Sequence, residues 1–454
     1  MESNKIGNYR WVIATLLLFS TTINYMDRQV ISYLKEYFST PVADGGFGWS
    51  NTDFAYVTSF FTAFYAGMTI IAGWVIDKIG TKLGLALSLI IWSTFGVLNA
   101  FVGGTVAMNV AVRSLFGVGE AGNFPASIKT IAEWFPKRER ALATGLFNSG
   151  SNIGAMISSL FVPWCLVYFG SELGWKMAFI ITGGIGFIWL IFWFAIYDVP
   201  GRHKKLSKAE LDYINSDDIV VHAAASEDVA LNPIGEKISW MKLLGYRQTW
   251  AFFFGKFMTD GIWWFLLFWL PDYLKKQFGF TGSEVMLPTF IVYGVAIFGS
   301  IFGGSIPMFF MNKGMEAYKA RMTAMLIISL FPLVLLSTQY FGDKAAFGDY
   351  ASTLAVAVIC IGAAAHQAWS ANLFTTVSDL FPKKAVGSIT GIGGLAGGIG
   401  GVLVQQLAGR LTDFYESTPQ TAYLIMFSVC AVSYVIAWAL MKLFVPRFSP
   451  ITDL

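Results

Sequence analysis

Four ionisable residues lie inside stretches of this chain that are otherwise apolar enough to cross a lipid bilayer: Asp27, Arg28, Arg113 and Glu120. A charged side chain near the centre of a membrane helix costs roughly 2.5–3.5 kcal/mol on insertion scales. Residues of this kind usually face a polar cavity and mark a pathway for ions or substrates. Their presence therefore predicts a functional pathway through a membrane protein.

The spacing of these residues suits chemistry with protons and anions. Arg113 and Glu120 are two helical turns apart and share one helix face, whereas Asp27 and Arg28 point about 100° apart. A carboxyl group in a low-dielectric cavity favours its neutral form and can carry a proton. A guanidinium stays charged and can hold a carboxylate with two hydrogen bonds. The alternative is a set of packed ion pairs that only locks two helices together.

The composition agrees with a membrane protein. Of 454 residues, 55% are hydrophobic and only 13% are charged, against about 25% charged in soluble domains. A net charge of +3 gives no reason to expect nucleic acid as a partner. The cysteines Cys165, Cys360 and Cys430 are far apart in apolar segments, so neither a disulfide framework nor a metal site is indicated. No cofactor is expected, because Gly117–Gly122 fits G-x-G-x-x-G only within a membrane-length helix and no Walker motif is found.

Membrane-spanning helices need about 20 apolar residues. The sequence predicts an all-α integral membrane protein with twelve transmembrane helices in two six-helix halves. We expect an N-terminal six-helix bundle over 1–199, a cytoplasmic linker over 200–247 and a C-terminal six-helix bundle over 248–454. The expected spans are Trp11–Tyr33, Phe54–Ile76, Leu83–Val102, Met108–Thr130, Ala141–Tyr168, Met177–Tyr197, Thr249–Leu274, Met286–Met311, Thr323–Thr338, Tyr350–Asp379, Ala385–Leu411 and Ala422–Phe444.

Lysine and arginine residues gather in the loops on one side of the expected helices. The positive-inside rule predicts that this side is cytoplasmic, so that both termini and the linker lie in the cytoplasm. The expected location of the protein is the plasma membrane, which in a bacterium is the inner membrane. The other side receives mainly Lys35, Lys176, Lys275, Lys276 and Lys344.

The two halves are related by an internal repeat. Glu133–Lys137 resembles Asp379–Lys383, and Val199–Pro200 matches Val445–Pro446. The offset is constant, since 379 − 133 and 446 − 200 both equal 246. Parallel six-helix repeats are typical of transporters whose substrate site lies near the membrane midplane, between the halves.

The loop expected after the second helix carries a motif, Gly73–Lys82, with the pattern Gly-x-x-x-Asp-basic-x-Gly-x-basic. Gly80 permits a tight turn there, and Asp77, next to Lys78, can cap a helix or pair across the seam between the halves. This pattern resembles the signature loop of the major facilitator superfamily, and the resemblance implies that Asp77, Lys78 and Gly80 act in gating. The alternative is an ordinary basic loop.

A second resemblance is more specific. Asn24–Arg28, the residues Arg113 and Glu120, and Asn123–Pro125 resemble the anion:cation symporter family of this superfamily, which carries organic anions with a coupling cation. The likeness covers essentially the whole chain and is greatest for the hexuronate transporters. Further stretches that carry it are Glu133–Pro136, Glu139–Ala141, Phe147–Gly150, Lys256–Trp263 and His366–Ser370.

The resemblance implies roles for residues in the first, second and fourth helices. Asp27 and Glu120 would carry protons. Arg28 would hold the substrate carboxylate, and Tyr25 and Tyr65 would donate hydrogen bonds to the substrate.

Arg113 would belong to the substrate-binding residues, and it could pair with Glu120 and release it when a proton arrives. In the fifth helix, Asn148 and Asn152 lie one turn apart and could bind substrate hydroxyl groups. The alternative for these two amides is that they join helices by hydrogen bonds, as small polar residues often do in membranes.

The seventh helix carries Lys256 and Asp260 at i,i+4 spacing. They either form a self-neutralised bridge or leave Lys256 free to reach a sugar carboxylate. Trp263 could stack on a sugar ring, although tryptophans are also frequent at membrane interfaces.

The tenth helix carries His366, Gln367 and Ser370. We expect Gln367 and Ser370 to take part in substrate binding. His366 could titrate, but a lone histidine is more often a satisfied polar group, which is the interpretation that we favour.

The sequence thus predicts a secondary active transporter, not an enzyme, that carries a small sugar-acid anion with protons by alternating access. A hexuronate such as glucuronate or galacturonate is the expected substrate, and the protein is expected to work as a monomer in the bilayer. Symport of an aldonate such as galactonate or of another small organic anion, and coupling to sodium, remain alternatives. Outside transport, a membrane sensor of sugar acids is the main rival, and a membrane enzyme would need a catalytic constellation that the sequence lacks.

Overall fold

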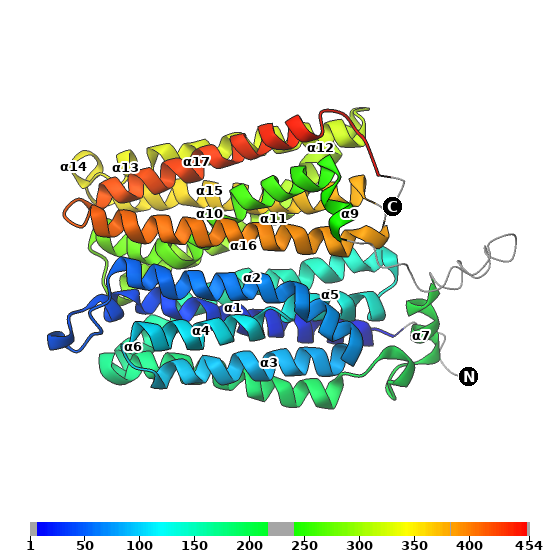
Figure 1. The fold of residues 1–454 in the computed structure, drawn as a ribbon, viewed down its shortest axis with the longest axis horizontal. Coiled ribbons are helices and arrows are strands. Elements are labelled where there is room, and N and C mark those ends of the chain that lie inside the picture. The colour runs from blue at the N-terminus through cyan, green and yellow to red at the C-terminus, as the bar shows by residue number, and fades with distance from the viewer. Residues whose placement is uncertain (1–6, 217–239, 382, 452–454) are drawn as a thin grey trace, which may run out of the picture.

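The computed structural model describes residues 7–216, 240–381 and 383–451. The described chain forms long helices that run in roughly the same direction and gather in two groups (Figure 1). The helices from α1 to α6 form one group, called the first half, and those from α10 to α17 form the other, called the second half.

The helices follow the expected spans. The first half contains α1 (Tyr9–Ser39), α2 (Asn51–Ile79), α3 (Thr81–Leu98), α4 (Val106–Glu120), α5 (Asn123–Trp134) and α6 (Lys137–Ile196). The described residues that follow include the short helices α7 (Lys208–Ile214) and α9 (Trp240–Leu244). The second half contains α10 (Arg247–Phe278), α11 (Met286–Asn312), α12 (Ala317–Leu330), α13 (Thr338–Phe341), α14 (Lys344–Phe347), α15 (Ala351–Leu380), α16 (Lys383–Phe414) and α17 (Pro419–Phe444).

Twelve membrane spans can be traced through these helices. Among the described residues, nine helical stretches are long and apolar enough to cross a membrane. One of them is α6, which a break at Gly170 divides into two spans. The remaining two spans are α1, which carries several charges, and α4 followed by α5. The expected twelve-helix fold is therefore confirmed.

Two breaks in the helices have clear local causes. Gly170 has φ 76° and ψ 163°, a conformation that glycine adopts readily because it lacks a Cβ atom. Pro125 has no backbone N–H, so it cannot bond to the carbonyl group four residues earlier, and the helix breaks one turn before it. This break places Glu120 at the end of α4, and α5 starts again at Asn123.

The bundle has two ends, which are named here without reference to the sides of the membrane. The start of α1, helix α7 and the residues after α17 lie at one end, called the terminal face (Figure 1). The opposite end, called the distal face, carries the end of α1, the start of α2 and the end of α10. Each long helix therefore connects one face to the other.

The two halves pack closely where α2 meets α16. Gly398 lies against Ala66, and Gly409 lies against Ala55, so closely that a Cβ atom on either glycine would overlap its neighbour. Small residues that let backbones approach each other are a common basis of helix packing in membranes. The glycines of α16 thus form a packing surface for the first half.

Helix α7 attaches the linker to the first half. Its N-cap is Ser207, whose hydroxyl accepts a hydrogen bond from the backbone N–H of Glu210 (3.2 Å). The Glu210 carboxylate accepts in turn from the backbone N–H groups of Tyr9 (3.2 Å) and Arg10 (3.1 Å), which have no partner within α1. Arg10 also bonds to Glu139 at the start of α6 (2.7 Å), so α7, the start of α1 and the start of α6 are joined to one another.

Candidate substrate and proton site

Arg28 and Glu120 form an ion pair inside the bundle. α1 supplies Arg28, and α4 ends at Glu120. The Nε and Nη2 atoms of Arg28 lie 2.9 and 2.8 Å from Oε2 of Glu120. Only 2% and 0% of the two side chains are exposed. The other carboxylate oxygen, Oε1, has no hydrogen-bond partner among the described residues, so one oxygen of this buried acid is uncommitted.

Four aromatic rings surround the Arg28 guanidinium. Its Cζ atom lies 4.4 Å from the ring centre of Tyr25, 4.6 Å from Tyr65, 5.1 Å from Trp264 and 5.5 Å from Phe61. Cation–π contacts at such distances are attractive, and more so where water is excluded. Trp264 belongs to α10, whereas the other rings belong to the first half, so Arg28 lies at the contact between the halves.

Asp27 points away from Arg28, as its position on the helix predicts. Its carboxylate lies beside Thr182 and within electrostatic range of Arg113, and neither of its oxygens has a hydrogen-bond partner among the described residues. Arg113 is also buried and rests on the rings of Phe116 (5.0 Å) and Phe179 (5.2 Å). The first half therefore holds a second acid and a second base, close together inside its core.

The partner of Glu120 is not the one expected from the sequence. We expected Arg113 to hold this carboxylate, but Arg28 does so, from 92 residues away along the chain. Arg113 lies within electrostatic range of Glu120, but the Nε and Nη2 atoms of Arg113 have no hydrogen-bond partner among the described residues. Glu120 instead meets α1, which crosses the end of α4.

A buried amide fixes the level at which α1 and α4 meet. Asn123, the first residue of α5, accepts a hydrogen bond from Ser20 Oγ (2.7 Å) and donates one from Nδ2 to Thr21 Oγ1 (3.2 Å). Ser20 and Thr21 lie about two turns before Arg28 on α1. Because Asn123 directly follows the helix break, this bond holds Glu120 at the level of Arg28.

The second half contributes another charge pair. Lys256 Nζ lies 2.5 Å from Asp260 Oδ2, so the bridge, one of the two arrangements expected, is present in this structure. Lys256 also lies 4.5 Å from the ring centre of Phe374. Asp260 is within electrostatic range of Tyr25 in the first half. The pair therefore lies near the aromatic residues that surround Arg28.

Trp263 and Trp264 have different partners. The Trp263 ring is parallel to the His366 ring, with ring centres 5.1 Å apart and an interplanar angle of 4°. His366 Nδ1 lies 2.8 Å from the hydroxyl oxygen of Tyr434, so this histidine is a satisfied buried group, as expected. Trp264, which contacts Arg28, was missed by sequence reasoning. Its i,i+4 spacing from Asp260 was the available signal, because such residues share a helix face.

The other expected substrate contacts are spread over both halves. Asn152 is buried, and its Oδ1 atom has no hydrogen-bond partner among the described residues. Asn148 lies one turn before it and is half-buried. Gln367 and Ser370 on α15 are half-buried as well. Their roles in binding remain predictions.

The motif loop has the expected backbone turn. Gly80 separates α2 from α3 with φ 84°, which favours glycine. The ammonium group of Lys78 lies 3.9 Å from the ring centre of Trp74. The side chain of Asp77 lies outside the described part of the structure. The expected gating role of these residues therefore remains a prediction.

Sequence reasoning also missed ion pairs that join the halves at the distal face. Lys35 Nζ of α1 lies 2.6 Å from Asp272 Oδ1 of α10, and the Lys35 side chain is only 2% exposed. One residue further on, Glu36 bonds to Lys275 (2.5 Å). Lys35 had been counted as a loop residue. Its place two turns after Arg28 was the available signal, because that spacing puts both residues on one face of α1.

Asp413 of α16 adds a helix cap across the same interface. Its Oδ1 atom accepts hydrogen bonds from the backbone N and the Nδ2 of Asn51 (2.8 Å each), and its Oδ2 accepts from the backbone N of Thr52 (2.7 Å). The two backbone donors are free N–H groups at the start of α2, where a negative charge is favourable. The distal face is therefore closed by a set of residues that we call the distal seal: Lys35, Glu36, Asn51, Thr52, Asp272, Lys275, Lys276 and Asp413.

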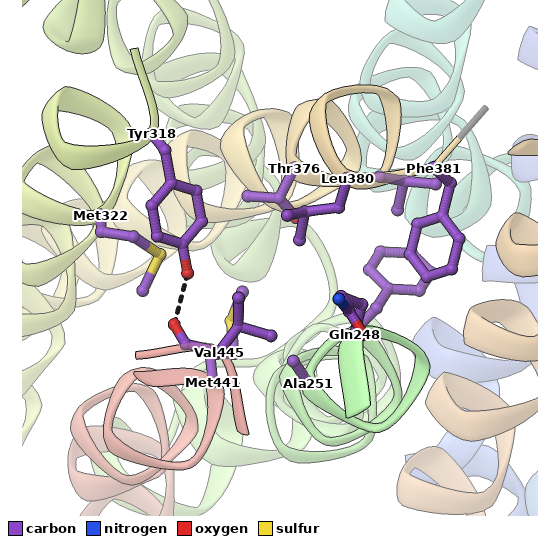
Figure 2. Close-up of a pocket in the computed structure, with 11 residues that line it drawn as sticks. Gln248, Ala251, Tyr318, Met322, Thr376, Leu380, Phe381, Met441 and Val445 are labelled. Carbon is purple, nitrogen blue, oxygen red and sulfur yellow. Dashed lines mark hydrogen bonds between the residues drawn. The ribbon is translucent and has the colours of Figure 1, made fainter. Parts of the chain in front are cut away.

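A separate pocket lies within the second half, near the terminal face (Figure 2). It is mainly apolar, and inside it the Tyr318 hydroxyl donates a hydrogen bond to the carbonyl oxygen of Val445 (2.6 Å). Its volume is about 10 Å³, roughly that needed by one water molecule. This pocket is too small for an organic substrate and contains none of the charged residues described above.

The sequence matches the Major Facilitator Superfamily over residues 17–405, and the chain belongs to this family. It is therefore a multi-pass membrane protein of a family of transporters, and not an enzyme. The resemblance to this superfamily that was seen in the sequence motifs is confirmed.

Individual relatives are transporters of sugar acids. The chain is 30% identical to the hexuronate transporter of Escherichia coli (strain K12), over 96% of this chain and 95% of that protein. It is 28% identical to the D-galactonate transporter of Escherichia coli O6:H1, over 96% of this chain and 97% of that protein. Among solved structures, a bacterial homolog of the human lysosomal transporter Spinster matches with a TM-score of 0.70 at 18% identity, covering 99% of this chain and all of that chain. This last likeness supports the fold alone.

Proposed function

We propose that this protein takes up a hexuronate, such as glucuronate or galacturonate, together with protons. The observation that carries the proposal is the buried pair of Arg28 and Glu120, which lies where the two halves meet. In a transporter that alternates between two openings, a site at this place would be reached from each side in turn.

The pair supports a coupled exchange of partners. A proton on Glu120 removes the negative charge that holds Arg28, and the guanidinium can then hold the substrate carboxylate with two hydrogen bonds. One carboxylate replaces another, so the net charge around Arg28 does not change. Either event alone would leave an uncompensated buried charge, which costs several kcal/mol. Proton and anion would therefore bind together.

Other residues of the first half would assist this exchange. Asp27 would take a second proton, because it is buried and its oxygens have no hydrogen-bond partner among the described residues, which favours the neutral acid. Tyr25 and Tyr65 flank the guanidinium and would donate hydrogen bonds to the substrate.

The proposed substrate class rests on the relatives as well as on the charges. Hexuronates and D-galactonate, named for the two relatives described above, are both polyhydroxylated acids with one carboxylate. A hexuronate is the first candidate, and an aldonate such as D-galactonate is the second.

We infer the orientation from the distribution of basic residues. The terminal face would be cytoplasmic in a plasma membrane, which in a bacterium is the inner membrane. The distal seal would then close the outer side, and the structure would represent a state that is closed to the outside. A membrane-impermeant label should accordingly reach cysteines introduced on the terminal face only after the cells are opened.

Uptake of radiolabelled glucuronate into proteoliposomes tests the proposed function. We expect accumulation above equilibrium under an inward proton gradient without sodium, and its loss when a protonophore is added. Unlabelled galacturonate and D-galactonate, added as competitors, should rank the two substrate classes.

Two results would contradict the proposal. A requirement for sodium in the accumulation of glucuronate would show that sodium, and not protons, is the coupling ion. Absence of glucuronate uptake, with uptake of D-galactonate, would favour the second candidate.

A further inference from the structure

We propose that Lys256 and Asp260 bind the hydroxyl groups of the sugar acid and so select sugar acids over plain carboxylates. This inference rests on the proposed function and adds a second subsite, in the second half, to the carboxylate site at Arg28.

The position of the pair fits the two ends of one small molecule. Lys256, Asp260 and Trp264 follow one another at i,i+4 spacing along one face of α10. Trp264 contacts Arg28 at 5.1 Å, and each further step of four residues is about 6 Å along the helix. The pair therefore starts about one turn from the carboxylate site, a distance comparable to the length of a six-carbon acid.

The chemistry of the pair suits hydroxyl groups. An ammonium group only donates hydrogen bonds and a carboxylate only accepts them, whereas a hydroxyl group does both. Two neighbouring hydroxyls can therefore bond to Lys256 and Asp260 at the same time without breaking the neutrality of the pair. The Asp260 side chain is 20% exposed, in contrast to 0% for Glu120, so it is accessible in this state.

A second carboxylate is a poorer ligand for the same pair. It would place two negative groups beside one ammonium group in a site with little water, which is unfavourable. Neutral hydroxyls bring no such penalty. The pair thus favours an acid with a single carboxylate and a polar far end over a diacid.

The hydrogen bonds to the sugar hydroxyl groups would come from Lys256 and Asp260 themselves. His366 lies within electrostatic range of Lys256, but its Nδ1 is already bonded to the Tyr434 hydroxyl. Gly397 of α16 lies directly against the Asp260 carboxylate, so that a Cβ atom there would overlap it. The backbone of α16 at Gly397 therefore restricts the movement of the Asp260 side chain toward that helix.

Binding to the purified full-length protein tests this inference. The ligands are glucuronate and cyclohexanecarboxylate, which has a ring of the same size and a carboxylate but no hydroxyl groups. In the double variant Lys256→Gln/Asp260→Asn, which keeps the site neutral, we expect glucuronate affinity to fall at least tenfold and cyclohexanecarboxylate affinity to change less than twofold. Isothermal calorimetry measures both.

The matched control is a Lys–Asp pair far from the site. Lys82 and Asp198 lie 3.2 Å apart near the terminal face of the first half, and the variant Lys82→Gln/Asp198→Asn should keep the wild-type ratio of the two affinities. If the double variant at the site fails to fold, the reversed pair Lys256→Asp/Asp260→Lys keeps the bridge but exchanges donor and acceptor positions. It should also lose selectivity for glucuronate.

Several results would overturn the inference. If the double variant lost affinity equally for glucuronate and cyclohexanecarboxylate, or for neither, the pair would not bind the hydroxyl groups. Tighter binding of galactarate than of glucuronate, abolished by Lys256→Gln, would show that Lys256 takes a second carboxylate. Absence of binding of any sugar acid to the wild-type protein would remove the proposed function itself, and this inference with it.

Discussion

Arg28 has two kinds of partner, a carboxylate on one edge of its guanidinium and aromatic rings around it. Both depend on the planar shape of the group. A lysine at this position would keep the charge but could neither bond to a carboxylate through two parallel N–H groups nor stack flat between the tyrosine rings.

We therefore predict that Arg28→Lys raises the KM for glucuronate about tenfold or more, which corresponds to at least about 1.4 kcal/mol. Counterflow in proteoliposomes measures this without any proton gradient. The control is Arg202→Lys on the exposed terminal face, which should leave KM unchanged. An unchanged KM in Arg28→Lys would remove Arg28 from the proposed carboxylate site.

The buried charges themselves could be predicted from the sequence, because an ionisable residue in an apolar span is costly and rare. Their partners could not. The contact of Arg28 with Glu120 depends on where α1 crosses the end of α4, which spacing within one helix does not show. Spacing within α10 was more informative, since it brings Lys256 and Asp260 together as a bridge.

At the scale of elements, α16 determines how closely the halves approach. Its glycines pack against α2, and replacing one of them adds volume where the backbones already touch. We expect Gly398→Leu to push α16 away from Ala66 and to open the interface toward the distal face. Gly394 lies one turn earlier, with no atom within 4 Å of a Cβ placed there, so Gly394→Leu is a matched control.

The readout is a cysteine placed at Ser59, which is 2% exposed and accepts a hydrogen bond from Gln406 across the interface. Its labelling by a membrane-impermeant maleimide should increase several-fold in Gly398→Leu and stay low in Gly394→Leu. Equal labelling in both backgrounds would show that this glycine does not set the contact.

The helices could be predicted well because the length of an apolar segment must match the bilayer. Local departures were harder to see. The fourth span was expected to run without interruption over Met108–Thr130, but Pro125 divides it into α4 and α5. That break matters for function, because it ends α4 at Glu120.

At the scale of the whole molecule, the distal seal holds the two halves in the state described here. Asp413 alone accepts three hydrogen bonds from Asn51 and Thr52 at the start of α2. We predict that Asp413→Asn weakens this closure, because an amide has one acceptor oxygen and no charge to offer the helix N-terminus. Labelling at Ser59→Cys should rise a few-fold. Glu416→Gln, an exposed change in the loop that follows, should have no effect.

The distal seal could not be deduced from the sequence, because it depends on how the two halves pack against each other. Lys35, Asp272 and Asp413 come from three different helices in two halves, and each of these residues also suits a solvent-exposed helix end. Only the packing of the halves brings them together.

The central claim is that a proton on Glu120 replaces Arg28 as the partner of that carboxylate when the substrate binds. Proton uptake during glucuronate binding to the purified protein, followed with a pH indicator in weakly buffered solution, tests it most directly. The measurement is made at a pH at which Glu120 is charged in the free protein. We predict that the solution becomes more alkaline as glucuronate binds. The variant Glu120→Gln should bind glucuronate with a clearly smaller proton uptake. Binding without proton uptake, or uptake that is the same in Glu120→Gln, would contradict the account.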